Sequence, residues 1–238
     1  MRVVMAALAA LFVLSGCDDD PNPAAGRFAF ADLDGRQAAR LDVVSGATVM
    51  VMRAADLGDQ LFRAWTPDGA KVVPTATVDQ DTVRLALRDT GGPGAAELHV
   101  ELSTRVDWRI RLDGGASQQS LDLRAARLTG LEFGAGSNRI EATLPRPEET
   151  VPVRMTGGAS VMDLHLPDGV PATVLIAGGA GSTTIDGNTR TGIAAGTTLS
   201  TLSTPDSGSA GGASANTDPT GYDINLLAGV SAFRIDRT

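Results

Sequence analysis

Cys17 is the residue whose type and position most clearly predict a chemical step, and it is the only cysteine among 238 residues. It follows an apolar run, Val3 to Val13, that is headed by Met1-Arg2 and ends in Leu14-Ser15-Gly16. A positive start, a short apolar stretch and a small-residue cleavage site are together typical of an export signal. The run is shorter than the roughly 20 residues that a helix needs to cross a bilayer. The sequence therefore predicts that the start of the chain directs export.

The box Leu14-Ser15-Gly16-Cys17 resembles the lipobox of bacterial lipoproteins. The resemblance implies that residues 1–16 are a signal peptide and that Cys17 is lipidated as the first residue of the mature chain. Two or three acyl chains hold a protein stably on a membrane, whereas one chain binds marginally. An ordinary cleaved signal is the alternative, and a lone thiol in an exported protein argues against it. The expected location is the bacterial cell membrane, on its extracytoplasmic face.

The net charge of the chain limits the classes of molecule that it is expected to bind. The chain has 20 Lys+Arg and 28 Asp+Glu, which gives a formal net charge of −8, and Lys71 is its only lysine. An acidic chain without a basic cluster is a poor candidate for binding nucleic acid or anionic lipid headgroups. The sequence therefore predicts no nucleic-acid partner, and a membrane partner only through Cys17.

The two histidines, His99 and His165, are the next candidates for chemistry. Each lies at a polar position of an alternating strand pattern, beside carboxylates. A catalytic role needs a nucleophile or a partnered carboxylate within hydrogen-bond reach. The pattern favours solvent-exposed strand faces instead, but it leaves open a metal site with both rings adjacent in space.

Five serines that follow small-residue corners could suggest a hydrolase. Gly-Ala-Ser is not the Gly-x-Ser-x-Gly elbow of such enzymes, and no turn from strand to helix follows it. Hydrogen bonds along a stack of corners would account for all five: Ser117, Ser137, Ser160, Ser182 and Ser231. The sequence therefore predicts no catalytic residue, and a protein that is not an enzyme.

Three acidic segments imitate metal sites. Gly178 to Asp186 is similar to a calcium-binding nonapeptide, but Thr183 stands where that pattern needs Asp. Asp32-Leu33-Asp34-Gly35 begins like an EF-hand loop, but the later acidic ligands are out of register. Asp18-Asp19-Asp20 has no further ligand nearby and indicates a spacer. We therefore predict no metal and no cofactor.

Arginines in the first half of the chain could form a strip that binds a polyanion. They are Arg84, Arg88, Arg105, Arg109 and Arg111. Acidic neighbours and the negative net charge favour a solvent-exposed face of mixed charge instead.

The elements that must position these residues are predicted to be strands. Apolar and polar residues alternate with period two over Val83–Leu87, Leu98–Leu102 and Val106–Leu112. The best helical segment, Ala54 to Ala64, has a thin apolar face that Gly58 interrupts. We therefore predict a nearly all-β protein.

The second half of the chain repeats a unit of strand, Gly/Ala/Ser corner and strand. Ser117, Ser137, Ser160 and Ser182 are 20, 23 and 22 residues apart, and the 49-residue gap to Ser231 contains an insertion. A period near 22 is typical of stacked β rungs that bury one another's apolar residues. Small corner residues are expected because strands stack about 4.8 Å apart. The alternative is a β-sandwich with Gly-rich hairpins.

The repeated corners, the Leu-Pro pairs at 144–145 and 166–167, Val170-Pro171, and the closing Tyr222-Asp223-Ile224 to Ile235-Asp236-Arg237 resemble the bacterial toast-rack, or adhesin-like, domain family. The resemblance is clearest over 100–238 and looser over 27–100. It implies a solenoid-like stack of β-strands in cell-envelope proteins, and no functional residue is carried over from it.

These observations predict a signal peptide over 1–16, a lipid-anchored tether over 17–26 and one β-solenoid-like domain over 27–238. Its repeats are clearest over 108–238, with a loop insertion at 204–221. The expected function is that of a non-catalytic interaction, scaffold or adhesin-like module with an envelope protein or cell-wall partner. Two alternatives stay open. A wide apolar cavity would favour a carrier of an apolar ligand, and two carboxylates in a cleft would favour an enzyme acting on cell-wall carbohydrate.

Overall fold

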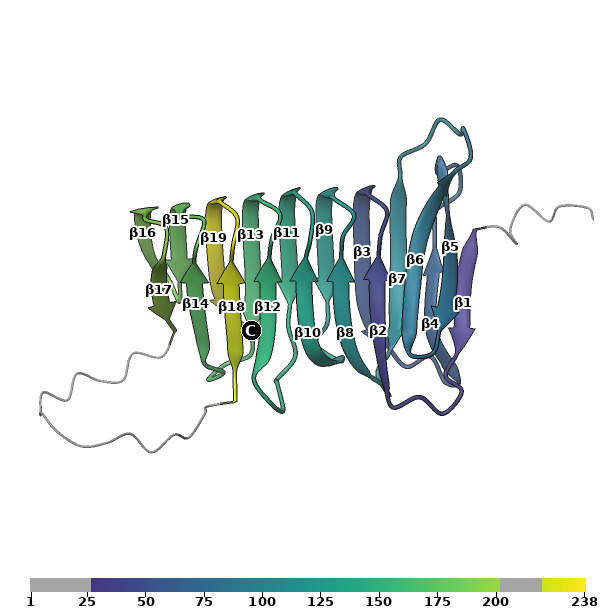
Figure 1. Cartoon of the computed structure of the whole chain (residues 1–238), viewed down its shortest axis with the longest axis horizontal. Helices are drawn as coiled ribbons and strands as arrows, with labels where there is room; N and C mark the ends of the chain where they lie inside the picture. Colours follow the sequence, from purple (N-terminus) through teal and green to yellow (C-terminus); the bar gives the residue numbers. More distant parts are fainter. Residues whose placement is uncertain (1–26, 202–219) are drawn as a thin grey trace, which may run out of the picture.

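The computed structural model describes residues 27–201 and 220–238. They form two β-sheets that lie face to face along the length of the molecule (Figure 1). No helix occurs in these two ranges, so none of the described residues could cross a bilayer as a helix. The prediction of an all-β stack of short strands is confirmed.

The first sheet, sheet A, contains ten strands. In spatial order they are β1 (Phe28–Asp32), β4 (Gln60–Trp65), β7 (Glu97–Ser103), β3 (Ala47–Ala55), β9 (Ala116–Asp122), β11 (Ser137–Thr143), β13 (Ala159–Leu166), β19 (Val230–Arg237), β15 (Ala180–Ile185) and β16 (Asn188–Ile193). The second sheet, sheet B, contains nine strands. In the same direction they are β5 (Val72–Asp79), β6 (Thr82–Asp89), β2 (Ala38–Val43), β8 (Asp107–Leu112), β10 (Arg127–Phe133), β12 (Val151–Met155), β18 (Tyr222–Leu226), β14 (Ala172–Ile176) and β17 (Thr197–Ser200).

Each rung of the stack is a sheet B strand followed by a corner and a sheet A strand. Neighbouring rungs pair in parallel, and the strands added at the ends of the stack pair antiparallel. Chain order and spatial order differ at both ends. The rung β2/β3 lies between β6/β7 and β8/β9. The last rung of the chain, β18/β19, lies between β12/β13 and β14/β15.

Near the end of the chain, the rungs are therefore not stacked in chain order. Ser231 belongs to a rung that lies between those of Ser160 and Ser182. The sequence does not specify this order, because every rung presents a similar alternating apolar face to either neighbour. Residues 180–201 instead contribute β15, β16 and β17, which end the stack.

Apolar and polar residues alternate along the strands, so the apolar side chains form rows in register that fill the space between the sheets. One row of sheet B contains Val83, Leu41, Ile110, Leu131, Val153, Ile224 and Val174. A facing row of sheet A contains Val100, Met52, Leu121, Ala142, Leu164 and Ile235. All of these residues are buried, and each large one contributes about 1.5–3 kcal/mol to stability. This filled interior opposes the carrier alternative.

The corners lie along one long edge of the stack, at the top of Figure 1. A Cβ added at Gly157 would overlap the backbone of Ala135 on the next rung. At Gly158 the nearest atom to such a Cβ would be the Gly229 carbonyl oxygen, at 3.2 Å. The close approach of stacked backbones therefore occurs at the first glycine of this corner rather than the second.

Register also corrects the prediction for the corner serines. Ser137 lies in register with Ala116 and Ala159, rather than with Ser117 and Ser160. Its hydroxyl accepts a hydrogen bond of 2.7 Å from Nε2 of the buried Gln119. Within 27–201 and 220–238, it is alone among the five corner serines in having a side-chain hydrogen bond. The prediction that these serines bond along the stack therefore holds for Ser137, whose partner is on the neighbouring rung, and is wrong for the other four.

Two local predictions can be checked against the backbone. The weak helical segment Ala54 to Ala64 instead contains the end of β3, a turn and most of β4. Asp34 and Gly35 have φ values of 47° and 72°, so the segment that imitates an EF-hand loop is a turn between β1 and β2.

Some predictions lie outside the described residues. Cys17, the signal peptide 1–16, the tether 17–26 and most of the loop 204–221 belong to this group. Gly221 is described, and its carbonyl oxygen accepts a 2.9 Å hydrogen bond from the Val151 amide. The last residue of the predicted loop is therefore part of the stack.

Candidate functional site

The two histidines lie far apart on sheet A. His99 is on β7 and His165 is on β13, with β3, β9 and β11 between them. At about 4.8 Å per strand, they are separated by about 19 Å. The ring centroids of His99 and Trp65 are 5.1 Å apart, and His99 Nε2 is 2.7 Å from Glu97 Oε1. A site with both rings on one metal is therefore excluded, and no cluster of three or more potential metal ligands occurs among the described residues.

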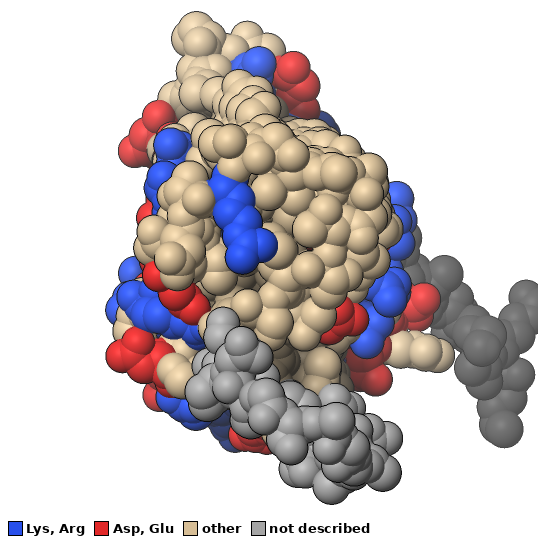
Figure 2. Space-filling view, turned by 90° about the vertical axis from the view of Figure 1, so that its left-hand side faces the viewer, with Lys and Arg blue, Asp and Glu red and all other residues tan. Residues whose placement is uncertain are grey.

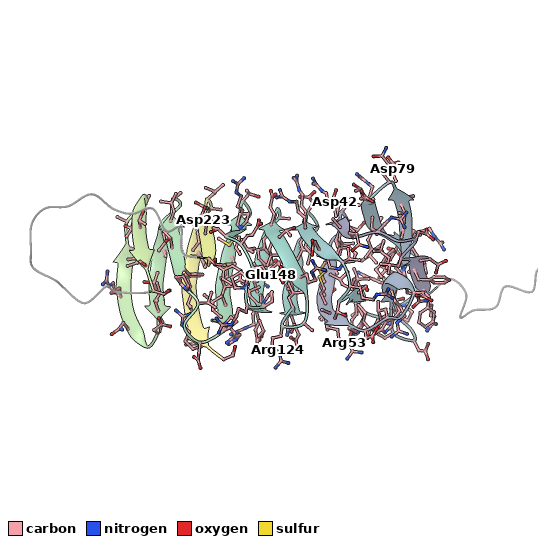
Figure 3. The ribbon with its side chains drawn as sticks, turned by 90° about the horizontal axis from the view of Figure 1, so that it is seen from below. Asp42, Arg53, Asp79, Arg124, Glu148 and Asp223 are labelled. Carbon is pink, nitrogen blue, oxygen red and sulfur yellow. The ribbon has the colours of Figure 1, made fainter. Side chains whose placement is uncertain are left out.

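A groove of about 370 Å³ brings three carboxylates near the loop between β11 and β12. Asp107, Glu148 and Glu149 line it, and Figure 3 shows Glu148 midway along the molecule as seen from below. Asp107 is paired with Arg127 at 2.7 Å, and both glutamates are exposed. Glycoside hydrolysis needs one carboxyl group whose environment keeps it protonated beside a second that stays ionised. These three side chains do not form such a pair.

The outer face of sheet A encloses one carboxylate between two arginines. Glu101 on β7 has a side chain that is only 1% exposed, and it lies between Arg53 on β3 and Arg63 on β4. The Nε atom of each arginine donates a 2.8 Å hydrogen bond to one carboxylate oxygen. Burial alone would raise the pKa of Glu101, but the hydrogen bonds and charges of the two arginines outweigh it and hold this pKa below its ordinary value.

A second group of the same kind lies four strands away in sheet A. Asp163 on β13 is buried and lies between Arg139 on β11, at 2.8 Å, and Arg234 on β19, at 3.4 Å. In both groups the strands on either side of the carboxylate supply the arginines. Sheet A therefore neutralises its most buried charges with its own side chains.

The outer face of sheet B carries a row of alternating charge. Side chains in register on β6, β2, β8, β10 and β12 are Arg84, Asp42, Arg111, Glu132 and Arg154. This row is the face of mixed charge that the sequence predicts for Arg84 and Arg111. Figure 3 shows Asp42 and Asp223 on this side of the molecule and Arg53 and Arg124 on the opposite side.

The neighbouring row of sheet B does not alternate. Arg40 and Arg109 are adjacent on β2 and β8, and Gly130 follows on β10. Arg109 therefore departs from the mixed-charge prediction. Arg105, which the sequence grouped with it, lies elsewhere and donates a 3.0 Å hydrogen bond to the Gly58 carbonyl oxygen.

A depression of about 210 Å³ lies in this face, with Gly130 among its lining residues. The Arg109 side chain lies over Gly130, with Cγ, Nε and Cζ within 3.6–3.7 Å of the position that a Cβ would occupy. The depression is lined by Arg40, Arg109, Arg111, Gly130, Glu132, Pro152 and Arg154, together with two buried core residues. This site is our candidate functional site.

Two of its four arginines are neutralised and two are not. Arg40 Nε is 2.6 Å from Asp42, and Arg111 Nε is 2.7 Å from Asp113. Arg109 and Arg154 have neither a hydrogen-bond partner nor an ion-pair partner in the described part of the chain. Both are exposed, so their guanidinium groups are accessible to a ligand.

Comparison with known proteins identifies the fold. No family model and no curated protein matches the chain. The structure is similar to that of a candidate cell adhesion protein from Clostridium sporogenes, with a TM-score of 0.59 and 13% identity over 89% of this chain and 98% of that one. The chain therefore shares its fold with that protein.

A second solved structure, a candidate adhesin from Bacteroides fragilis, aligns over 88% of this chain and 97% of that one. Its TM-score is 0.30 and its identity is 10%, so no argument rests on it.

Two arginines of this site could not be found from spacing along the chain. Arg40 and Arg154 were not grouped with Arg109, because they come from rungs separated by many residues. A detectable signal exists, since Asp42, Arg111, Glu132 and Arg154 each come shortly before a corner. Aligning the repeats by their corners places these four side chains in one row.

Figure 2 shows a different surface at the end of the stack formed by β16 and β17. Few charged side chains lie on this end, whereas they line both flanks. At this end of the stack, the charged side chains therefore lie on the flanks rather than on the end surface.

Proposed function

We propose that the chain is a lipid-anchored, non-catalytic module of the cell envelope that binds its partner through an outer sheet face. The observation that carries this proposal is the open arginine site on sheet B, which lies on an extended face over a filled interior. The adhesin-like fold supports it.

The proposed location rests on the sequence before the stack. The box that ends at Cys17 favours a lipid anchor at the extracytoplasmic face of the membrane. The nine residues Asp18–Gly26 span at most about 30 Å when extended. The stack would therefore remain next to the membrane and meet envelope proteins or cell-wall polymers there.

The proposed absence of catalysis rests on the separation of chemical groups. His99 and His165 lie on different parts of sheet A, and the carboxylates of the one acidic groove are paired or exposed. Charged side chains recur along rows instead, which suits binding by many weak contacts.

Anchoring is tested with Cys17→Ala in the full chain expressed in a bacterium. We expect this variant to leave the membrane fraction or to accumulate with its signal peptide attached. Ser117→Ala, at an exposed corner, is the control and should fractionate like the unchanged chain. Membrane association that survives Cys17→Ala would rule out this anchor.

Binding is tested by sedimenting the full chain, held in a neutral detergent, with isolated cell envelopes. We expect it to sediment with them, and EDTA to leave the bound fraction unchanged. The non-catalytic proposal fails if envelope material is degraded and a single Asp, Glu or His substitution abolishes that degradation.

A further inference from the structure

We propose that the depression over Gly130 on sheet B binds carboxylate groups of an acidic polysaccharide. This inference rests on the proposed function and deepens it, because it names the ligand class of the same face. The site contains Arg109 on β8, in register with Gly130, and Arg154 on β12, in register with Glu132, and Pro152 also lines it.

Two of the positive charges at the depression have no partner among the described residues. Arg109 and Arg154 are exposed and unpaired within the described residues, although the chain as a whole has a net charge of −8. Elsewhere on these sheets, several arginines are bonded to carboxylates: Arg40, Arg53, Arg111 and Arg139. A guanidinium donates two parallel hydrogen bonds to a carboxylate, so two free ones define a site for such groups.

The shape of the depression comes from the strands that carry it. Arg109 and Arg154 come from β8 and β12, whose backbones are about 10 Å apart with β10 between them. On β10 the register shifts between Leu128 and Gly130, and the Arg109 side chain lies over Gly130, which has no side chain of its own. Such irregularities commonly redirect side chains at functional positions.

The charge pattern around the depression distinguishes a polysaccharide from a denser polyanion. In the row that contains Arg154, Asp42 and Glu132 separate the arginines, so like charges recur only at every second strand, about 10 Å apart. A polymer with closely spaced anionic groups would place some of them against these two carboxylates. Carboxylates separated by uncharged parts of sugar rings avoid that repulsion, and Pro152 offers the rings an uncharged contact.

The test measures the affinity of polygalacturonate for the full chain in neutral detergent at low salt. Arg109→Ala/Arg154→Ala should weaken binding at least about tenfold, because two charge-assisted contacts are lost. Arg88→Ala/Arg190→Ala is the matched control. It removes the same charge from two exposed arginines without partners in the described residues and away from the depression, so it should change affinity less than about threefold. Equal loss in both variants would overturn the site, since it would show attraction by overall charge alone.

One further variant and two other polymers identify the class of ligand. Glu132→Gln removes the acidic wall of the depression and should tighten polygalacturonate binding several-fold. Neutral dextran should not bind, and inorganic polyphosphate should bind at least about tenfold more weakly than polygalacturonate. Polyphosphate binding as tight as that of polygalacturonate would refute the assignment to acidic polysaccharide.

The inference and the proposed function can fail separately. If polygalacturonate does not bind but the chain still sediments with cell envelopes, the ligand class proposed here is wrong and the binding function stands. If neither is bound, both are wrong.

Discussion

The same rungs build the outer faces of sheets A and B, but the charged side chains are arranged differently on the two faces. On sheet A, Glu101 and Asp163 are each enclosed by two arginines from the strands on either side. On sheet B, Arg109 and Arg154 lie at a depression with no partner in the described residues. The difference indicates which charges stabilise the stack and which are available to bind a ligand.

Burial of the carboxylate explains the first arrangement. An ionised carboxylate without a partner is costly in a protected position, so the two flanking arginines compensate the loss of hydration of Glu101. Arg109 and Arg154 are hydrated at an exposed face and lose little by lacking partners. Substitutions should therefore affect stability on sheet A and binding on sheet B.

The largest effect should come from breaking the register on which both faces depend. Gly157→Val places a side chain against the backbone of Ala135 on the neighbouring rung. We expect a loss of at least about 4 kcal/mol in the free energy of unfolding, measured by urea denaturation, because the backbones must separate. Gly158→Val is the control, with an expected loss of about 1 kcal/mol, since its nearest contact is 3.2 Å away. Equal losses would contradict the stacking geometry.

Removing the two arginines that flank Glu101 on sheet A should have the next largest effect on stability. Arg53→Ala/Arg63→Ala leaves Glu101 buried without a cation, and we expect a loss of about 3 kcal/mol in the free energy of unfolding. The exposed pair Arg88→Ala/Arg190→Ala should change it by less than about 0.5 kcal/mol. A cost as small as that of the control would show that Glu101 is not stabilised by its arginines.

The same group predicts how stability depends on pH. The pKa of Glu101 is lowered in the folded chain, so the unfolded chain binds a proton first as pH falls below the ordinary value of 4.5. The stabilisation by Glu101 is therefore complete above this value and is lost as pH falls through the folded pKa. Urea denaturation across this range should show a shallower loss in Glu101→Gln. An unchanged slope would assign the acid sensitivity to other carboxylates.

The smallest effect on stability is expected on sheet B. Arg109→Ala/Arg154→Ala removes two exposed guanidiniums that bond to none of the described residues, so the free energy of unfolding should change by less than about 0.5 kcal/mol. Thermal unfolding followed by circular dichroism provides the check. A loss of more than 1 kcal/mol would mean that these arginines stabilise the stack.

Local patterns allowed the strands to be predicted, but not the order of the rungs. The alternation over Val106–Leu112 corresponds to β8, because period two specifies which side chains face the interior. The position of β18/β19 inside the stack could not be predicted, since its apolar face resembles that of every other rung.

The candidate site was only partly predictable for the same reason. Arg109 was recognised as a candidate because it lies close in sequence to other arginines. Arg154 joins it through the parallel register of β8, β10 and β12, which spacing along the chain does not reveal. The role of Gly130 depends on a register shift that no residue pattern signals.

The most direct test of the difference between the two faces compares one double variant from each. Polygalacturonate affinity is measured for the unchanged chain, Arg109→Ala/Arg154→Ala and Arg139→Ala/Arg234→Ala, at a temperature where all three are folded. We predict at least a tenfold loss of affinity for the sheet B variant. The sheet A variant should lose less than threefold, although it is the less stable of the two. Equal losses of affinity, or a larger loss for the sheet A variant, would contradict the assignment of binding to sheet B.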